Sequence, residues 1–244
     1  MPTKWYEGKI ISMEDASPTV RRFFLEVEDV DEFDFKPGQF ITIDLPISEK
    51  RLGRWRSYSI ANEPGDNNIL ELCIVKLEGG SGTDYLFNEI GEGDKLKFKG
   101  PDGMFVLPKD LEREIVFLCT GTGVAPFRSM LKHIYKHHLP HQNMHLIYGT
   151  RYNTGILYEE EFLEMARMDK KFIYDVTLSR EDKIKSPHHS KGYIHPIYME
   201  KYKDVDPNRL FLICGWSDMI DEAVANLIIN LGYDKTQVKY ELYG

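Results

Sequence analysis

Residues 115–126 read Ile115-Val116-Phe117-Leu118-Cys119-Thr120-Gly121-Thr122-Gly123-Val124-Ala125-Pro126. The run starts with four apolar residues, typical of a strand buried on both faces of a parallel sheet. The two glycines let the backbone approach a ligand closely, and a helix starting there offers its N-terminal amides to a phosphate. Pro126 is tolerated in a first helical turn. The stretch predicts a strand, a glycine-rich turn and a helix; a turn without ligand is the alternative.

The rest of the second half repeats this alternation. Apolar runs at 144–148, 172–178, 210–214 and 238–242 predict further strands, and helical periodicity covers 124–137, 159–168 and 219–231. Alternating strands and helices indicate an α/β doubly wound parallel sheet.

The first half has a different period. Alternating apolar and polar residues predict strands at 23–27, 39–44, 70–75 and 95–99, separated by glycine- and proline-containing turns. One short helix is expected at about 83–90. Many short antiparallel strands indicate a small closed β-barrel. We therefore expect two domains, 1–110 and 111–244, with the boundary between Pro108 and Glu114.

The composition narrows the possible functions. The chain has 244 residues, a net charge of −8 and 42% hydrophobic residues, which suits two globular domains and argues against nucleic-acid binding. No apolar run approaches the roughly 20 residues of a membrane span, and residues 1–8 do not resemble a signal peptide, so a cytoplasmic location is expected. Three scattered cysteines are too few for a typical iron–sulfur cluster, so a one-electron partner would be a separate molecule or a bound organic cofactor.

Three further segments carry candidate chemistry. Arg56, Tyr58 and Ser59 offer a phosphate clamp, a flat ring and a hydroxyl on one strand, although a half-exposed strand with a surface arginine is the alternative. The glycine-rich run from Gly79 opens a helix and is a second candidate phosphate site. Cys214-Gly215 ends a parallel strand, where ligands bind; a small buried side chain before a helix is the alternative.

In this order the motifs resemble the ferredoxin–NADP⁺ reductase superfamily of flavoproteins over nearly the whole chain. The resemblance rests on Arg56-x-Tyr58-Ser59, Gly80-x-x-Thr83-x-Tyr85-Leu86, Gly93-Asp94, Gly100-Pro101-x-Gly103-x-Phe105, the turn from Thr120 to Pro126, Tyr148-Gly149-x-Arg151, Ser179-Arg180, Cys214-Gly215 and Glu241-x-Tyr243. Any single motif is weak, but the full ordered set is hard to obtain by chance.

The resemblance implies two cofactors, FAD and NADP, and assigns their sites. FAD is expected to contact Arg56, Ser57, Tyr58, Ser59, Ile74, Val75, Lys76, Ser81, Gly82, Thr83 and Tyr243. The nicotinamide nucleotide is expected to contact Thr120, Gly121, Thr122, Gly123, Arg151, Ser179, Arg180, Lys191, Tyr193, Cys214 and Gly215. Catalytic roles fall on Ser59, Cys214 and Glu241. Tyr243 matches an aromatic residue that covers the isoalloxazine, but Gly244 follows it here, whereas some members end on the aromatic residue.

The choice between NADPH and NADH depends on the adenosine end of the nucleotide. A Ser-Arg pair matching Ser179-Arg180 holds the 2′-phosphate in NADP-using members, and Tyr193 matches a tyrosine that stacks on adenine. Glu181 and Asp182 follow at once and could neutralise Arg180. We expect NADPH to be preferred.

The resemblance implies hydride transfer between nicotinamide C4 and flavin N5, with ferredoxin or flavodoxin as the separate electron carrier. Lys50, Arg51 and Arg54 could attract an acidic carrier, or be an ordinary surface loop. The enzymatic alternatives are an NAD(P)H:flavin reductase and the reductase component of an oxygenase. The non-enzymatic alternative is a nucleotide-sensing module.

Other polar groups fit ordinary surface or core roles. His133 and His137 are spaced like a metal pair but lack a third ligand in the motif, so a solvated helix face and no metal site are expected. His188-His189 is interpreted as a polar loop. Cys73 and Cys119 are expected in the core.

Overall fold

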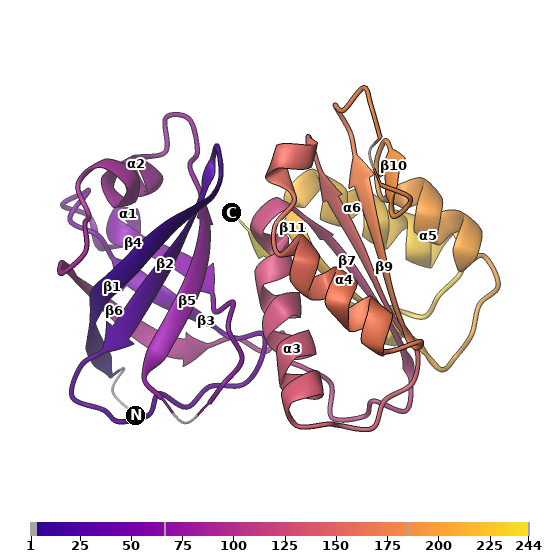
Figure 1. The fold of residues 1–244 in the computed structure, drawn as a ribbon, viewed down its shortest axis with the longest axis horizontal. Helices are drawn as coiled ribbons and strands as arrows, with labels where there is room; N and C mark the ends of the chain where they lie inside the picture. Colours follow the sequence, from indigo (N-terminus) through magenta and orange to yellow (C-terminus); the bar gives the residue numbers. More distant parts are fainter. Residues whose placement is uncertain (1–3, 66, 185, 244) are drawn as a thin grey trace. The chain divides into compact units, whose positions relative to one another are not determined.

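The first hundred residues form an antiparallel, barrel-like sheet in the computed structural model, which describes residues 4–65, 67–184 and 186–243 (Figure 1). Its six strands within the described residues lie in the order β4-β3-β6-β1-β2-β5. They are β1 Trp5–Ser17, β2 Val20–Val27, β3 Phe40–Asp44, β4 Trp55–Ser59, β5 Ile69–Val75 and β6 Lys95–Asp102. A bridge between Ile60 and Leu72 connects the end of β4 to β5, which brings the two edge strands together.

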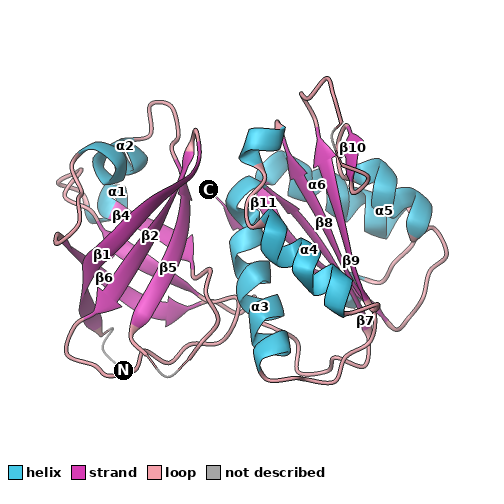
Figure 2. Ribbon diagram, in the orientation of Figure 1, coloured by secondary structure: helices cyan, strands magenta, loops and turns pink. Residues whose placement is uncertain are grey.

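Alternating side chains form the core of this sheet. On β2, Phe23, Leu25 and Val27 are buried, while Glu26 between them is exposed. The period of two places every second residue on the inner face, as the sequence predicts. Two short helices, α1 Arg51–Arg54 and α2 Ser81–Asn88, interrupt the strands (Figure 2). The expected helix at 83–90 is therefore present but starts two residues earlier.

The contacts divide the chain into two units, and helix α3, Val124–Lys136, is grouped with the barrel. The barrel unit contains residues 1–107 and 125–138. Arg128 of α3 donates to the Glu71 carboxylate at 2.7 Å and to the Ala61 carbonyl at 3.0 Å. Both charged side chains are at least 95% buried, and the Glu71 carboxylate also accepts from Arg22 at 2.7 Å, so Glu71 connects α3 with strands β2 and β5 of the barrel.

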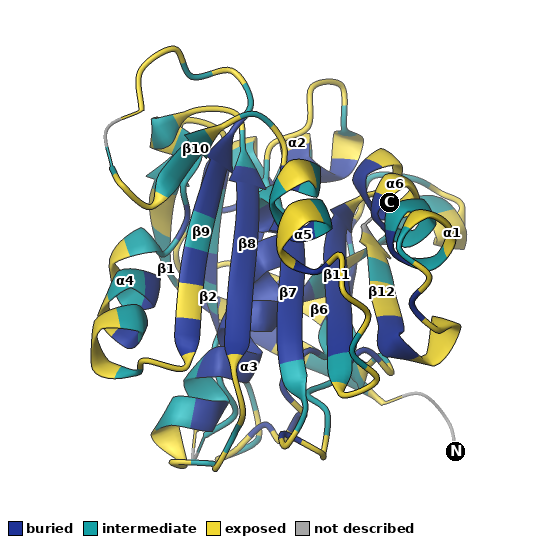
Figure 3. Cartoon of the chain, turned by 90° about the vertical axis from the view of Figure 1, so that its right-hand side faces the viewer, coloured by how far each residue is buried: buried dark blue, intermediate teal, exposed yellow. Residues whose placement is uncertain are grey.

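The second unit, residues 108–124 and 139–244, is a parallel sheet with helices on its faces. Its strands lie in the order β10-β9-β8-β7-β11-β12. They are β7 Glu114–Thr120, β8 Met144–Thr150, β9 Phe172–Leu178, β10 His189–Lys191, β11 Arg209–Trp216 and β12 Val238–Tyr243. The helices are α4 Glu159–Met168, α5 His195–Lys201 and α6 Ser217–Ala225, which continues as a π-helical turn at Asn226–Asn230. Figure 3 shows β7, β8 and β11 buried along most of their length, as their continuous apolar runs require.

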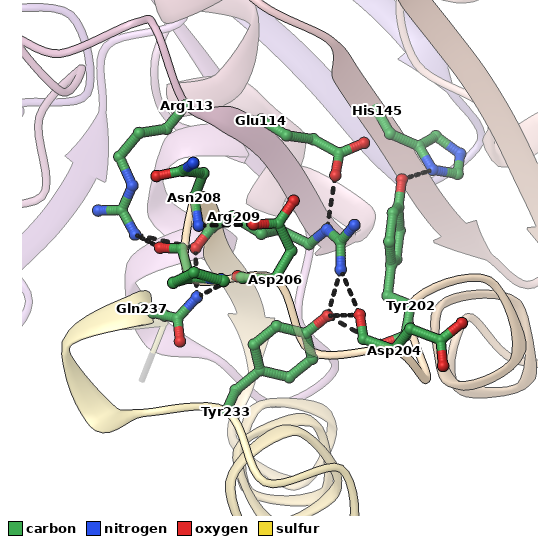
Figure 4. A network of polar contacts seen from close by, with 11 residues as sticks. Arg113, Glu114, His145, Tyr202, Asp204, Asp206, Asn208, Arg209, Tyr233 and Gln237 are labelled. Carbon is green, nitrogen blue, oxygen red and sulfur yellow. Dashed lines mark hydrogen bonds and ion pairs between the residues drawn. The ribbon is translucent and has the colours of Figure 1, made fainter.

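A polar network fixes the amino-terminal edge of this sheet (Figure 4). Arg209 and Glu114 are the first residues of adjacent strands, and the guanidinium donates to the carboxylate at 2.6 Å. Arg209 also donates to the Tyr233 hydroxyl and to the Asp204 carbonyl. The network lies at the edge opposite to the one where ligands of parallel sheets bind, so its role is structural.

A second buried chain of hydrogen bonds contains His145. Its Nδ1 lies 2.7 Å from the Tyr202 hydroxyl and its Nε2 lies 2.8 Å from the Asp175 carboxylate. Burial lowers the pKa of His145 below its ordinary value of 6.5, despite the Asp175 carboxylate. The imidazole is therefore neutral at pH 7, donating through Nε2 and accepting from Tyr202.

The predicted fold class is confirmed: an antiparallel barrel-like sheet precedes a doubly wound parallel sheet. Sequence patterns missed β1, α1, α5 and β10. The interpretation of His188-His189 as a polar loop is wrong for His189, which begins β10 and pairs with Glu159 at 2.5 Å. Among the described residues, no helix is both long enough and apolar enough to cross a bilayer.

Candidate functional site

The expected flavin site begins where β4 lies beside the start of α2. A Cβ built on Gly82 would lie 2.9 Å from Nε of Arg56 and 3.0 Å from its Cγ, so only glycine admits the arginine this close. The N-cap residue of α2, Gly80, provides no side-chain hydrogen bond to the first turn. A guanidinium and the amides of a helix N-terminus therefore lie side by side, which is suitable for a pyrophosphate.

The hydrogen bonds of Arg56 leave donors available. Within the described residues, Nη1 alone is used, toward the carbonyls of Gly53 and Trp55 at 3.2 and 2.8 Å. No carboxylate pairs with this arginine among those residues. A cation held against a helix N-terminus without a counter-charge fits the phosphates of FAD.

The remaining predicted flavin residues surround this point. Tyr58 is partly buried, and burial raises its pKa to about 12 although Arg56 lowers it, so the phenol stays protonated and able to donate. Ser59 is 5% exposed and Ser57 bonds to the Thr42 hydroxyl at 2.9 Å. Thr83 accepts the Leu77 amide at 3.1 Å, which closes the glycine-rich loop. Ile74 is buried, Val75 is partly buried, and Lys76 and Ser81 are exposed.

The expected nicotinamide site lies at the carboxyl edge of the parallel sheet. After β7, Gly121–Gly123 forms a 3₁₀ turn that leads into α3. A Cβ on Gly123 would lie 2.3 Å from the carbonyl oxygen of Cys214, and one on Gly215 would lie 2.4 Å from the Thr120 hydroxyl. The two predicted segments, Thr120–Gly123 and Cys214-Gly215, are therefore in direct contact.

One polar atom in this contact has no hydrogen-bond partner among the described residues. The Thr120 hydroxyl is buried and makes no hydrogen bond within the described residues. A buried hydroxyl without a partner costs free energy unless a ligand or water completes it. Together with the close backbone approach at Gly215, it fits a nucleotide at this edge.

Strand register places two predicted catalytic residues in one row. Cys214 pairs with Cys119 on one side and with Glu241 on the other, and both thiols are fully buried. Paired residues of parallel neighbours point to the same face, so the three side chains share a face of the sheet. Burial and the neighbouring Cys214 raise the pKa of Cys119, which remains a thiol. Ser59, the third predicted catalytic residue, belongs to the barrel unit.

Backbone hydrogen bonds connect the residues expected at the adenosine end. The amides of Ser179 and Arg180 donate to the carbonyls of Thr150 and Arg151, at 3.0 and 2.9 Å. Lys191 pairs with Leu178 in the β9–β10 register, and Tyr193 follows it with 70% exposure. The ends of adjacent strands thus carry three cations and one exposed ring, those of Arg151, Arg180, Lys191 and Tyr193.

Two features were missed from the sequence. Trp216 ends β11 half-exposed, with its indole Nε1 4.0 Å from where a Gly121 Cβ would lie. The contact of Glu181 was also not predicted: this residue, which could have neutralised Arg180, accepts from the backbone amide of Asn153 at 2.9 Å. The side chain of Tyr243 lies outside the described residues. The rings of His133 and His137 are tilted by 52° with their centroids 4.4 Å apart, and no cluster of three or more metal ligands occurs in the described part of the chain.

The chain resembles known oxidoreductases over most of its length. The model of the oxidoreductase FAD-binding domain matches residues 7–107, and that of the oxidoreductase NAD-binding domain matches residues 117–225. Ferredoxin–NADP reductase B of Sorangium cellulosum is 29% identical over 98% of this chain and 97% of its own length. The phenol hydroxylase P5 protein of Acinetobacter pittii is 28% identical over 91% of this chain, which spans 61% of that protein.

The fold has close counterparts among solved structures. An Amycolatopsis cytochrome P450 reductase superimposes with a TM-score of 0.87 at 24% identity, over 99% of this chain and 70% of that one. The two family models together span most of the sequence, and each matches one of the two sheets described above. The chain belongs to the ferredoxin–NADP⁺ reductase superfamily of FAD-dependent oxidoreductases, which exchange electrons with a nicotinamide nucleotide.

Proposed function

We propose that this oxidoreductase uses NADP(H) and exchanges electrons with ferredoxin or flavodoxin. The observation that carries the nucleotide choice is the set of backbone bonds that brings Arg151, Arg180 and Lys191 to one edge of the sheet. A 2′-phosphate is a dianion, so it requires positive charge and donors where NADH presents only a hydroxyl.

The proposal divides the work between residues 1–110, which hold FAD, and residues 111–244, which hold the nucleotide. When bound, FAD takes up or gives a hydride at N5 and passes on electrons. Arg56 and the first amides of α2 neutralise its pyrophosphate. Tyr58 provides a protonated phenol, and the Ser59 hydroxyl is available for a hydrogen bond near N5.

The nucleotide side uses the carboxyl edge of the sheet. The turn Thr120–Gly123 receives the pyrophosphate, with the Thr120 hydroxyl as a donor that has no partner in the described residues. Cys214 and Gly215 border the nicotinamide, and Glu241 lies one strand further along the same row. Tyr193, already exposed, stacks on the adenine.

A carrier with acidic surface groups suits the barrel unit. Arg51 and Lys99 lie 4.3 and 4.2 Å from the ring of Trp55, and Lys97 lies 5.3 Å from that of Trp5. Arg54 is paired with Asp44 at 2.8 Å, so it contributes less than the sequence suggested. The free cations would attract a negatively charged partner despite the net charge of −8.

A second candidate is the reductase component of an oxygenase, which the similarity to the phenol hydroxylase P5 protein favours. One experiment separates the candidates. The FAD-loaded protein is reduced with NADPH or NADH, and electron delivery to a ferredoxin, a flavodoxin and free FMN is followed by absorbance. Fast delivery to ferredoxin or flavodoxin with NADPH supports the proposal; preference for FMN or NADH contradicts it, and no bleaching by either nucleotide indicates a sensing module.

A further inference from the structure

Four hydrogen bonds between described residues join the segments at the ends of β8 and β9. Two are backbone bonds, from Ser179 to Thr150 and from Arg180 to Arg151, and the Ser179 hydroxyl also donates to the Thr150 carbonyl at 3.5 Å. The fourth is made by a carboxylate: Glu181 accepts from the amide of Asn153 at 2.9 Å. Asn153 begins a 3₁₀ turn, Asn153–Gly155, whose N-cap residue provides no side-chain acceptor of its own. Glu181 therefore caps that turn from the neighbouring loop.

The Glu181 carboxylate binds the Asn153 amide and not Arg180, the residue next to it in the sequence. Among the described residues, neither Arg151 nor Arg180 makes an ion pair, although Glu181 directly follows Arg180. The next acid, Asp182, is 98% exposed at its side chain and lies 3.9 Å from Lys191. The two arginines thus keep their positive charge available for an anion.

Keeping two arginines in bonded loops has a physical cost. The positive charges of Arg151 and Arg180 are carried by adjacent loops and repel each other. Until a phosphate binds, no negative charge of a ligand offsets this repulsion. The side chain of Glu181 reaches from its own loop to the Asn153 amide in the other loop, so it is suited to hold the two loops together.

We propose that Glu181 is a positioning residue for the 2′-phosphate: it holds the Arg151 loop against the Ser179-Arg180 loop without contacting the nucleotide. The inference rests on the proposed preference for NADP(H) and adds the residue that maintains the geometry behind it. It requires an acceptor of the right reach at position 181, whereas a counter-charge role would require only a negative charge.

Two conservative variants separate these roles. Glu181→Gln keeps an acceptor of the same reach and removes the charge, while Glu181→Asp keeps the charge and shortens the side chain. The positioning role predicts nearly normal binding in E181Q and weaker binding in E181D. A counter-charge role predicts tighter phosphate binding in E181Q and little change in E181D.

The test measures binding of 2′,5′-ADP and of 5′-AMP to the FAD-loaded protein by calorimetry, with Asp182→Asn as the matched control. We expect E181D to weaken 2′,5′-ADP binding about three- to tenfold and leave 5′-AMP unchanged, with E181Q and D182N within twofold of the unmodified protein. Equal 2′,5′-ADP affinity in E181D and the unmodified protein, or tighter binding in E181Q, would overturn the inference alone. If the unmodified protein does not prefer 2′,5′-ADP to 5′-AMP, the proposed nucleotide preference fails and the inference falls with it.

Discussion

The backbone amide of Arg180 donates to the carbonyl oxygen of Arg151 at 2.9 Å. These residues are 29 positions apart, yet this bond fixes the spacing between the two loops that carry them. Adjacent parallel strands end at the same edge of the sheet, so a bond just beyond the ends of β8 and β9 extends their pairing into the binding edge.

The first prediction concerns this edge. Arg180→Ala removes a guanidinium expected at the 2′-phosphate, so KM for NADPH should rise at least several-fold while KM for NADH stays nearly unchanged. Steady-state reduction of the flavin with each nucleotide measures both. Arg167→Ala on α4, another exposed arginine of the same unit, is the control. Equal use of NADPH and NADH by the unmodified protein would refute the assignment whatever the variant does.

The second prediction concerns Arg56. Arg56→Ala should cost about 1.5–3 kcal/mol of charge-assisted hydrogen bonding to the FAD pyrophosphate, so the variant should purify partly free of flavin. The ratio of absorbance at 450 nm to that at 280 nm, and FAD titration of the apoprotein, measure the loss. Arg54→Ala should retain FAD, because that arginine pairs with Asp44. Full occupancy in R56A would show that the phosphates bind elsewhere.

The third prediction concerns Cys214. If its thiol borders the nicotinamide, Cys214→Ala slows flavin reduction at saturating nucleotide more than it weakens FAD binding. Cys119→Ala is a matched control, since that thiol is equally buried and lies beside Cys214 in the next strand. Stopped-flow bleaching of both variants decides the question. The same rate loss in both would indicate a packing effect alone.

The fourth prediction concerns pH and stability. His145 has a pKa below its ordinary 6.5 because it is buried, so the folded state binds fewer protons than the unfolded chain just below pH 6.5. The free energy of unfolding should therefore fall as the pH drops from about 6.5, by up to about 1.4 kcal/mol for each unit by which the pKa is lowered. Urea titrations between pH 7 and pH 5 measure this.

A variant isolates the contribution of His145. His145→Gln keeps a donor and an acceptor for Asp175 and Tyr202 but cannot titrate, so its stability should depend less on pH in that interval. Burial pushes the pKa of Asp175 up, but the hydrogen bond and charge of His145 outweigh it, and the net pKa lies below 3.8. The stability that Asp175 contributes is lost only at lower pH, outside the interval. His137→Gln, at an exposed position in the turn that follows α3, should keep the full slope.

Short-range patterns were sufficient for the fold class and for the local structure of the candidate segments. The apolar run before Thr120 and the alternation around Phe23 each depend on neighbouring residues, so the sequence alone reveals them. The contact between Gly123 and Cys214 could be anticipated only through the family resemblance, because the two residues are 91 positions apart in the sequence.

Other features depend on contacts that no local pattern encodes. Glu181 next to Arg180 suggested an ion pair, but the carboxylate finds an amide in the previous loop instead. Arg128 is an ordinary helix residue in the sequence, and only the fold shows its buried pairing with Glu71. Strand β10 is three residues long, too short for alternation to be recognised.

The burial of all three cysteines gives the molecule its own reporters of local opening. A thiol reacts with an alkylating reagent only when it becomes exposed as a thiolate, so the labelling rate follows the frequency with which the surrounding structure opens. Cys73 lies in the barrel, whereas Cys119 and Cys214 lie in the parallel sheet. Mass spectrometry of alkylated peptides would therefore measure the rate of local opening of each sheet separately. Repeating the measurement with each cofactor bound would show in which sheet that cofactor lowers the rate.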